Sequence, residues 1–146
     1  MNHHRELPAE FLALLDFKAP PLRSLFLDLR AYVLELYPDS NELLYHTHAL
    51  TSVFSLSEKL GDGFCMIPIY TNHLNLGFHK GTLLQDPLQL LQGTGNLIRH
   101  IPVASPADYR NKKVRDLLLA AIDFATGDMD KPTNARGRTI SKIKKG

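Results

Sequence analysis

Residues 76–103 read LGFHKGTLLQDPLQLLQGTGNLIRHIPV and contain signals for a strand, a short helix, a turn and a second strand in immediate succession. Asp86 and Pro87 are typical of a helix start, because a carboxylate accepts hydrogen bonds from the free amides of the first turn and proline suits the first helical position. Gly93 is typical of a helix end. We therefore expect a helix over residues 87–92 between two strands.

The turn after this helix is the most distinctive local feature of the chain. Residues 93–96 read Gly-Thr-Gly-Asn, and glycine and asparagine tolerate positive φ. A strand is predicted over residues 97–103, where Arg99 and His100 alternate onto opposite faces. The turn would expose backbone amides near these two side chains and form an anion-holding corner. Alternatively, the glycines only redirect the chain, and Arg99 and His100 lie on a solvated or paired edge.

Helices are predicted on both sides of a run of strands. Apolar residues over 22–36 repeat with the three-four spacing of an amphipathic helix, which Pro38 ends. A shorter helix is expected to start at Glu6-Leu7-Pro8 and to reach about Leu15. Ser105 and Asp108 form a capping-box pattern that begins a helix reaching Ala125.

Strands are expected between the two groups of helices. Residues 42–56 read as strand material, of which residues 53–56 belong either to the following turn or to a second strand. Residues 64–70 are apolar and β-prone, and residues 71–73 turn the chain into a strand over 74–78. Strands clustered between helices predict an α+β fold, with an antiparallel sheet of about four to five strands covered by N- and C-terminal helices.

Charge divides the chain into a body and a tail. The net charge is +2, but all six lysines and arginines after residue 130 lie in a segment without acidic residues, so the preceding part is mildly acidic. We expect one domain over residues 1–126 and a basic, disordered tail over residues 127–146. The tail would contact nucleic acid weakly through phosphates, or would only aid solubility.

Several functional classes are not expected. No apolar run is long enough to span a bilayer, and the N-terminal residues lack the apolar region of a secretory signal. The single cysteine, Cys65, lies in an apolar run and is expected to be buried in a cytoplasmic protein. No Gly-x-Ser-x-Gly elbow or paired catalytic carboxylates appear, so we expect a binding protein rather than an enzyme.

The pattern of residues 76–101 resembles the YdhG-like family, small bacterial proteins built on a domain of unknown function. The positions that carry the resemblance are Leu76-Gly77-Phe78, Gly81, Leu84, Asp86-Pro87, Leu90-Leu91, Gly93, Gly95 and Arg99-His100-Ile101. The resemblance covers roughly residues 6–126 and implies an α+β fold without an established activity. Some members are described as iron chaperones by likeness to frataxin, but this sequence lacks the dense acidic ridge that such a role needs.

The favoured interpretation is a binding module for an acidic small molecule or a protein partner at the corner formed by residues 93–100. The side chains and turn residues expected to bind this ligand are Tyr70, His79, Lys80, Gly93, Gly95, Asn96, Arg99 and His100. Lys80 and Arg99 would favour an acidic group. Ligand identity and oligomeric state are left open by the sequence.

A metal carrier is the alternative interpretation. His46 and His48 are two residues apart in the predicted strand and would point to the same side, where His73 could complete a site for zinc or iron. Their spacing matches no compact metal motif. Histidines on a strand are also commonly hydrogen-bonded residues of the core or edge.

Overall fold

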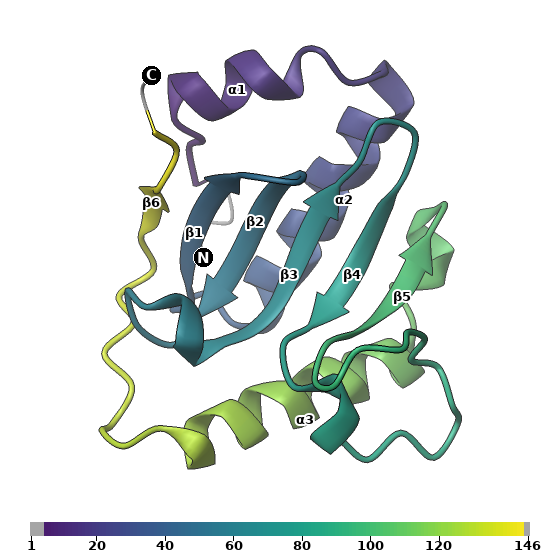
Figure 1. Cartoon of the computed structure of the whole chain (residues 1–146), viewed down its shortest axis with the longest axis vertical. Helices are drawn as coiled ribbons and strands as arrows, with labels where there is room; N and C mark the ends of the chain where they lie inside the picture. Colours follow the sequence, from purple (N-terminus) through teal and green to yellow (C-terminus); the bar gives the residue numbers. More distant parts are fainter. Residues whose placement is uncertain (1–4, 145–146) are drawn as a thin grey trace.

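The computed structural model describes residues 5–144 and has an α+β fold, as predicted (Figure 1). The helices are α1 (Ala9–Leu15), α2 (Pro20–Leu36) and α3 (Lys112–Asp128). The strands are β1 (Asn41–His46), β2 (Leu50–Ser55), β3 (Gly63–Ile69), β4 (Leu74–Phe78), β5 (Arg99–Val103) and β6 (Thr139–Ser141). Three short 3-10 turns, η1 (Leu60–Asp62), η2 (Gly81–Leu83) and η3 (Pro106–Asp108), occupy the connections.

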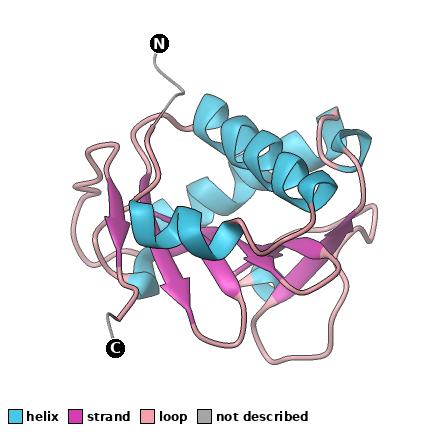
Figure 2. Ribbon diagram, turned by 90° about the horizontal axis from the view of Figure 1, so that it is seen from above, coloured by secondary structure: helices cyan, strands magenta, loops and turns pink. Residues whose placement is uncertain are grey.

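The six strands form one sheet in the order β5-β4-β3-β2-β1-β6. Neighbouring strands are antiparallel except β1 and β6, which are parallel. The three α-helices lie on one side of the sheet (Figure 2). Among residues 5–144, none of the helices combines the length and apolarity that crossing a membrane requires.

The core lies between the sheet and the helices. Strand alternation turns Leu44, Phe54 and Ile67 toward α2 and α3, where they join Phe26 and Leu118 in one buried cluster. Burial of such side chains removes apolar surface from water and is the main stabilising contribution to the fold. The prediction for α2 was correct for its end and for the burial of Leu22, Phe26, Leu29 and Val33, but Arg30, which its spacing placed on the exposed side, is buried.

The strand material expected over residues 42–56 is a hairpin of β1 and β2, and its second strand begins at Leu50 rather than at Val53. The chain turns at residues 47–49, where the Thr47 amide donates to the Ala49 carbonyl at 3.3 Å. This turn contains neither glycine nor proline, so an alternating pattern of apolar and polar residues ran through it without interruption. As a result, His46 ends a strand and His48 lies in an exposed turn.

The helix expected over residues 87–92 is absent, and this part of the chain is a loop. The Asp86 carboxylate does accept hydrogen bonds from nearby amides, those of Leu90 at 3.0 Å and Leu91 at 2.8 Å. Gln92 exchanges two backbone hydrogen bonds with His100, at 2.8 and 2.9 Å. A helix of six residues has too few internal hydrogen bonds to compete with this pairing to β5.

The boundaries of the other helices also differ from the predictions. Ser105 and Asp108 form the expected capping box, but it caps the 3-10 turn η3 rather than a long helix. α3 begins later, where the Asn111 side chain accepts a hydrogen bond from the Val114 amide at 2.9 Å. At the other end Gly127 lies inside α3, which continues to Asp128.

The C-terminal segment predicted to be disordered contains a strand. β6 pairs with β1, with Ile140 opposite Leu43, and the Glu42 amide donates to the Arg138 carbonyl at 2.8 Å. The Asn41 side-chain oxygen accepts from the amides of Arg136 and Arg138, both at 3.1 Å. These backbone contacts hold a polar segment that has little apolar surface of its own.

A buried ion pair connects α2 to β1, the strand that pairs with β6. Arg30 is 6% exposed and donates from Nε and Nη2 to the Glu42 carboxylate, which is fully buried, at 2.8–3.0 Å. Ser52 of β2 and Thr139 of β6 also donate hydroxyl hydrogen bonds to Glu42, the latter at 2.9 Å. Four donors from three other elements therefore satisfy one buried carboxylate, which is the condition under which a buried charge is tolerated.

We expect Arg30→Met to lower the free energy of unfolding by about 3–5 kcal/mol, because it leaves the Glu42 carboxylate buried without its cation. The double variant Arg30→Met/Glu42→Leu should recover part of this loss. Urea denaturation measures both, with the exposed Lys112→Gln as a control that should change little. A loss below about 1 kcal/mol for Arg30→Met would contradict this role of the pair.

Candidate functional site

The Arg99 guanidinium of the predicted corner is occupied by its own loop. Its Nη1 donates to the carbonyls of Gly95 and of Ile98, the latter at 2.9 Å. Its aliphatic stem lies against Gly81, where an added Cβ would stand 2.5 Å from the Arg99 Cβ. Arg99 therefore braces the turn instead of presenting a free cation to a ligand.

The other corner residues also hold the loop in place. Gly93 has a φ of +132°, a conformation that L side chains rarely adopt, so glycine is needed here. The Asn96 carbonyl accepts a hydrogen bond from Thr82 Oγ1 at 2.9 Å. The main cavities among residues 5–144 are lined by residues other than Gly93, Gly95, Asn96, Arg99 and His100. The alternative interpretation, in which the glycines redirect the chain, fits this geometry.

His79 is packed against β3 rather than exposed to a ligand. A Cβ added at Gly63 would stand 2.7 Å from His79 Cε1 and Nε2, so the imidazole occupies the space that a side chain at position 63 would fill. Both ring nitrogens are buried and neither has a hydrogen-bond partner among the described residues. Burial lowers the pKa of His79 from 6.5 to about 4, and the nearby Phe64 backbone offsets part of the effect.

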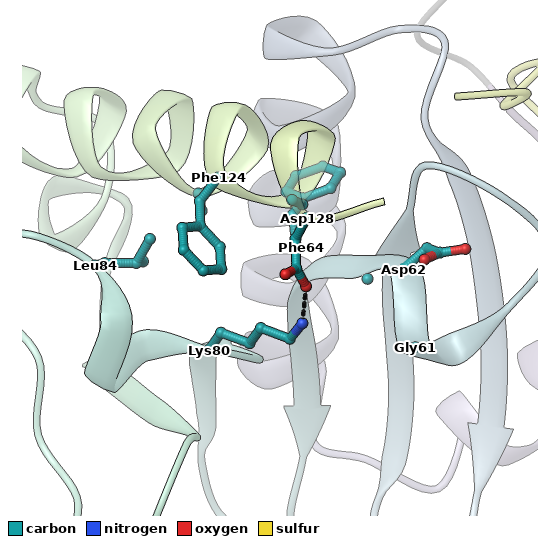
Figure 3. A pocket seen from close by; sticks show the side chains of 10 residues that line it. Gly61, Asp62, Phe64, Lys80, Leu84, Phe124 and Asp128 are labelled. Atoms are coloured by element: carbon teal, nitrogen blue, oxygen red, sulfur yellow. Dashed lines mark hydrogen bonds and ion pairs between the residues drawn. The ribbon is translucent and has the colours of Figure 1, made fainter. Parts of the chain in front are cut away.

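Lys80 lines a small cavity between η1, β3 and α3, but its charge is neutralised there (Figure 3). Lys80 Nζ forms an ion pair with the Asp128 carboxylate at the end of α3. The cavity of about 20 Å³ has room for roughly one water molecule. Lys80 is the one predicted ligand residue that lines this cavity, and its ammonium is paired with Asp128 rather than available to a ligand.

Tyr70 and His73 form a stacked pair at the β3–β4 turn, with ring centroids 4.7 Å apart. The Tyr70 carbonyl accepts a hydrogen bond from Lys18 Nζ at 3.1 Å, and His73 borders a shallow hollow beside the start of α2. This pair lies at the opposite end of β3 and β4 from Gly63 and His79, so the predicted ligand residues do not form one site.

The histidines predicted to bind metal do not assemble into a ligand set. His46 and His48 are exposed at the β1–β2 turn, and His73 is exposed at the β3–β4 turn. Within residues 5–144, no group of three or more His, Cys, Asp or Glu side chains is placed to hold a metal ion. Cys65 is buried as expected, and burial raises the pKa of its thiol, which opposes a nucleophilic role.

A better-formed hollow lies next to the predicted corner, between the 85–90 loop and the first half of α3. Its volume is about 220 Å³. Apolar side chains make up much of its wall, and charged side chains of α3 lie at its border. The lining residues are Gln85, Asp86, Pro87, Leu88, Leu90, Lys112, Lys113, Asp116, Leu117 and Ala120. We call this cavity the α3 hollow.

The polar groups around the α3 hollow differ in how far they are already satisfied. The Asp86 carboxylate accepts two backbone hydrogen bonds, and Lys112 is paired with Asp116 at 2.7 Å. Lys113 is exposed and has no ion-pair partner within the described part of the chain. The cation available to a ligand is therefore Lys113.

Comparison with models of known protein families, with characterised proteins and with solved structures finds no match. The resemblance to the YdhG-like family thus stays a prediction from the sequence.

The sequence contained part of the signal for the α3 hollow. Asp86-Pro87 and the apolar residues that follow were singled out, but as a capped helix rather than as one wall of a cavity. The sequence did not single out Lys112 and Lys113, because the last helix was predicted to begin at Ser105 and these residues then fell in its interior rather than in its first turn. The meeting of the loop with α3 brings together residues about 30 positions apart.

We expect the pH dependence of stability to report on His79. A histidine whose pKa is lowered by folding binds a proton more readily when unfolded, so the folded state loses stability as the pH falls from about 6.5 to about 4. The shift corresponds to at most about 3 kcal/mol. Urea denaturation at several pH values should show that His79→Leu removes this part of the loss. The matched control, exposed His73→Gln, should retain it; equal curves for wild type and His79→Leu would refute the assignment.

Proposed function

We propose that this protein is a binding module for a small molecule with an apolar body and an acidic group, held in the α3 hollow. The observation that carries the proposal is a cavity of about 220 Å³ with a mostly apolar wall and an unpaired lysine, Lys113, at its border in the described chain. Binding sites for small molecules are typically apolar concavities with a few polar groups that orient the ligand.

The size of the α3 hollow limits the ligand. A cavity of about 150 Å³ accommodates benzene, so this hollow suits a single ring, or a branched chain of similar size, with a short acidic arm. Leu117 and Ala120 on α3 face Pro87 and Leu90 across the hollow and would contact the apolar body. The acidic group would then reach Lys113 at the border.

The surrounding contacts support a hollow that exists before a ligand arrives. The 85–90 loop is held by the two hydrogen bonds to Asp86, and the Gln92–His100 bridge ties the chain beyond it to β5. The opposite wall is a 17-residue helix with Leu117 buried in the core. A preformed site loses less conformational entropy on binding than a site that must be ordered.

We expect phenylacetate to bind in the α3 hollow and Ala120→Phe to abolish that binding by filling it. The matched control is Leu119→Phe, one residue away on the exposed surface of α3. Lys113→Gln should lower the affinity for phenylacetate by about three- to fivefold, because it removes the charge interaction with the carboxylate. The affinity for the neutral 2-phenylethanol should not change.

Amide chemical shifts in a titration by NMR locate the bound probe and give its affinity. Shifts that cluster on residues 85–90 and 112–120 support the proposal. Shifts elsewhere, or equal binding to wild type and Ala120→Phe, overturn it.

A further inference from the structure

The C-terminal segment carries an alternating pattern that the fold turns into a row of charge. Over residues 136–144 the even-numbered positions are Arg136, Arg138, Ile140, Lys142 and Lys144. All four of the cations among them are exposed, whereas the odd-numbered positions are partly buried. Because alternate residues of a strand point to the same side, Arg138 and Lys142, which flank β6, share one side of the chain. Arg136 precedes Gly137, where a φ of +71° bends the chain, and Lys144 follows the end of β6.

The pairing with β1 shows which side of the sheet this is. Thr139 lies opposite Glu42 and donates to its carboxylate on the helix-covered side. Ile140 lies opposite Leu43, on the other side. Arg138 and Lys142, on either side of β6, therefore lie along the edge of the sheet face that the three α-helices leave uncovered. Figures 1 and 2 show β6 at this edge and the helices on the other side of the sheet.

The sheet face next to these cations is uncharged, and its centre is closed by Leu43 and Val53, which are buried. The strand register places on it a set of partly exposed side chains: Tyr45, Thr51, Met66, Pro68 and Asn75. Tyr45 lies one position beyond the last registered pair of β1 and β6, next to Lys142. An aromatic ring thus stands where the row of cations meets the face.

We propose that the row formed by Arg136, Arg138, Lys142 and Lys144, together with the adjoining sheet face, binds single-stranded nucleic acid. Arg138 and Lys142 are four residues apart across β6, about 13 Å along a strand, and Arg136 and Lys144 extend the group of cations at either end, so the edge offers several separate contacts to a chain of phosphates. Proteins that bind single strands combine such contacts with side chains against which bases stack. Tyr45 is the stacking platform that the register supplies.

A single strand fits this surface better than other polyanions. The cations lie on the edge of a sheet, and no helix of the described chain projects from that edge to enter a duplex groove. An acidic peptide would find the cations but would make no use of the uncharged face beside them. One acid lies close to the row: Glu58 is 3.8 Å from Arg138, and this exposed pair is weak enough for a phosphate to displace.

This surface is separate from the α3 hollow, which is lined by α3 and the 85–90 loop. Binding of nucleic acid and binding of phenylacetate can therefore fail independently.

The proposal is tested by fluorescence anisotropy of labelled 20-nucleotide dT and U strands with the full chain, at several salt concentrations. The variant Arg136→Gln/Arg138→Gln/Lys142→Gln/Lys144→Gln should lose most of the affinity. Its logarithmic salt dependence should become shallower by about 0.7 for each phosphate that the variant no longer neutralises. The double variant Arg136→Gln/Arg138→Gln is compared with Arg23→Gln/Arg115→Gln, a matched pair of arginines on α2 and α3, which should bind like wild type.

Tyr45→Leu should weaken binding by about tenfold without altering the salt dependence, because stacking is removed and the interactions with phosphates stay. A thermal unfolding curve for each variant separates loss of binding from loss of fold. No binding by wild type at 50 mM salt, or an equal loss in the two arginine pairs, would overturn the proposal. So would equal affinity for polyglutamate, a duplex of the same length or anionic phosphatidylserine vesicles.

Discussion

The buried carboxylate of Glu42 is the constraint on which much of the structure depends. It is fully buried and receives hydrogen bonds from Arg30 on α2, Ser52 on β2 and Thr139 on β6. An ionised carboxylate in an apolar interior is costly unless it is paired and hydrogen-bonded. The four elements must therefore meet in one register, since any other register would leave the charge without its donors.

This constraint explains the ordered C-terminal segment. The segment has few apolar side chains to bury, so hydrophobic burial alone would not hold it against the sheet. The Thr139 hydroxyl donates a hydrogen bond to Glu42, and the Asn41 side-chain oxygen accepts hydrogen bonds from two backbone amides of the segment. Once Thr139 is held on the helix-covered side in this way, Arg138 and Lys142 point to the uncovered side of the sheet. The same polar contacts thus determine both the edge strand and the proposed nucleic-acid surface.

At the opposite edge of the sheet, next to β5, the glycine-rich region after β4 is also held by polar contacts. Arg99, Asp86 and the backbone of His100 all form hydrogen bonds within the loop or between the loop and β5. These groups resemble ligand-binding residues in the sequence because they are polar and close together. In the structure their hydrogen bonds hold the loop, and the loop in turn forms one wall of the α3 hollow. The residues that attract attention in the sequence therefore build the proposed site, and Lys113, outside that region, would contact the ligand.

The sequence by itself determined the fold class, the apolar part of the buried side of α2, the β3–β4 hairpin and the burial of Cys65. These features follow from local rules: the three-four spacing of a helix, the alternation of a strand and the apolar run around residue 65. Only the tertiary structure decided that residues 87–92 form a loop, that residues 139–141 add a sixth strand and that Lys113 borders a hollow. In each case distant parts of the chain meet: Gln92 with His100, Thr139 with Glu42, and the 85–90 loop with α3. Local propensity is weak for such short or polar segments, so pairing partners far along the chain determine their conformation.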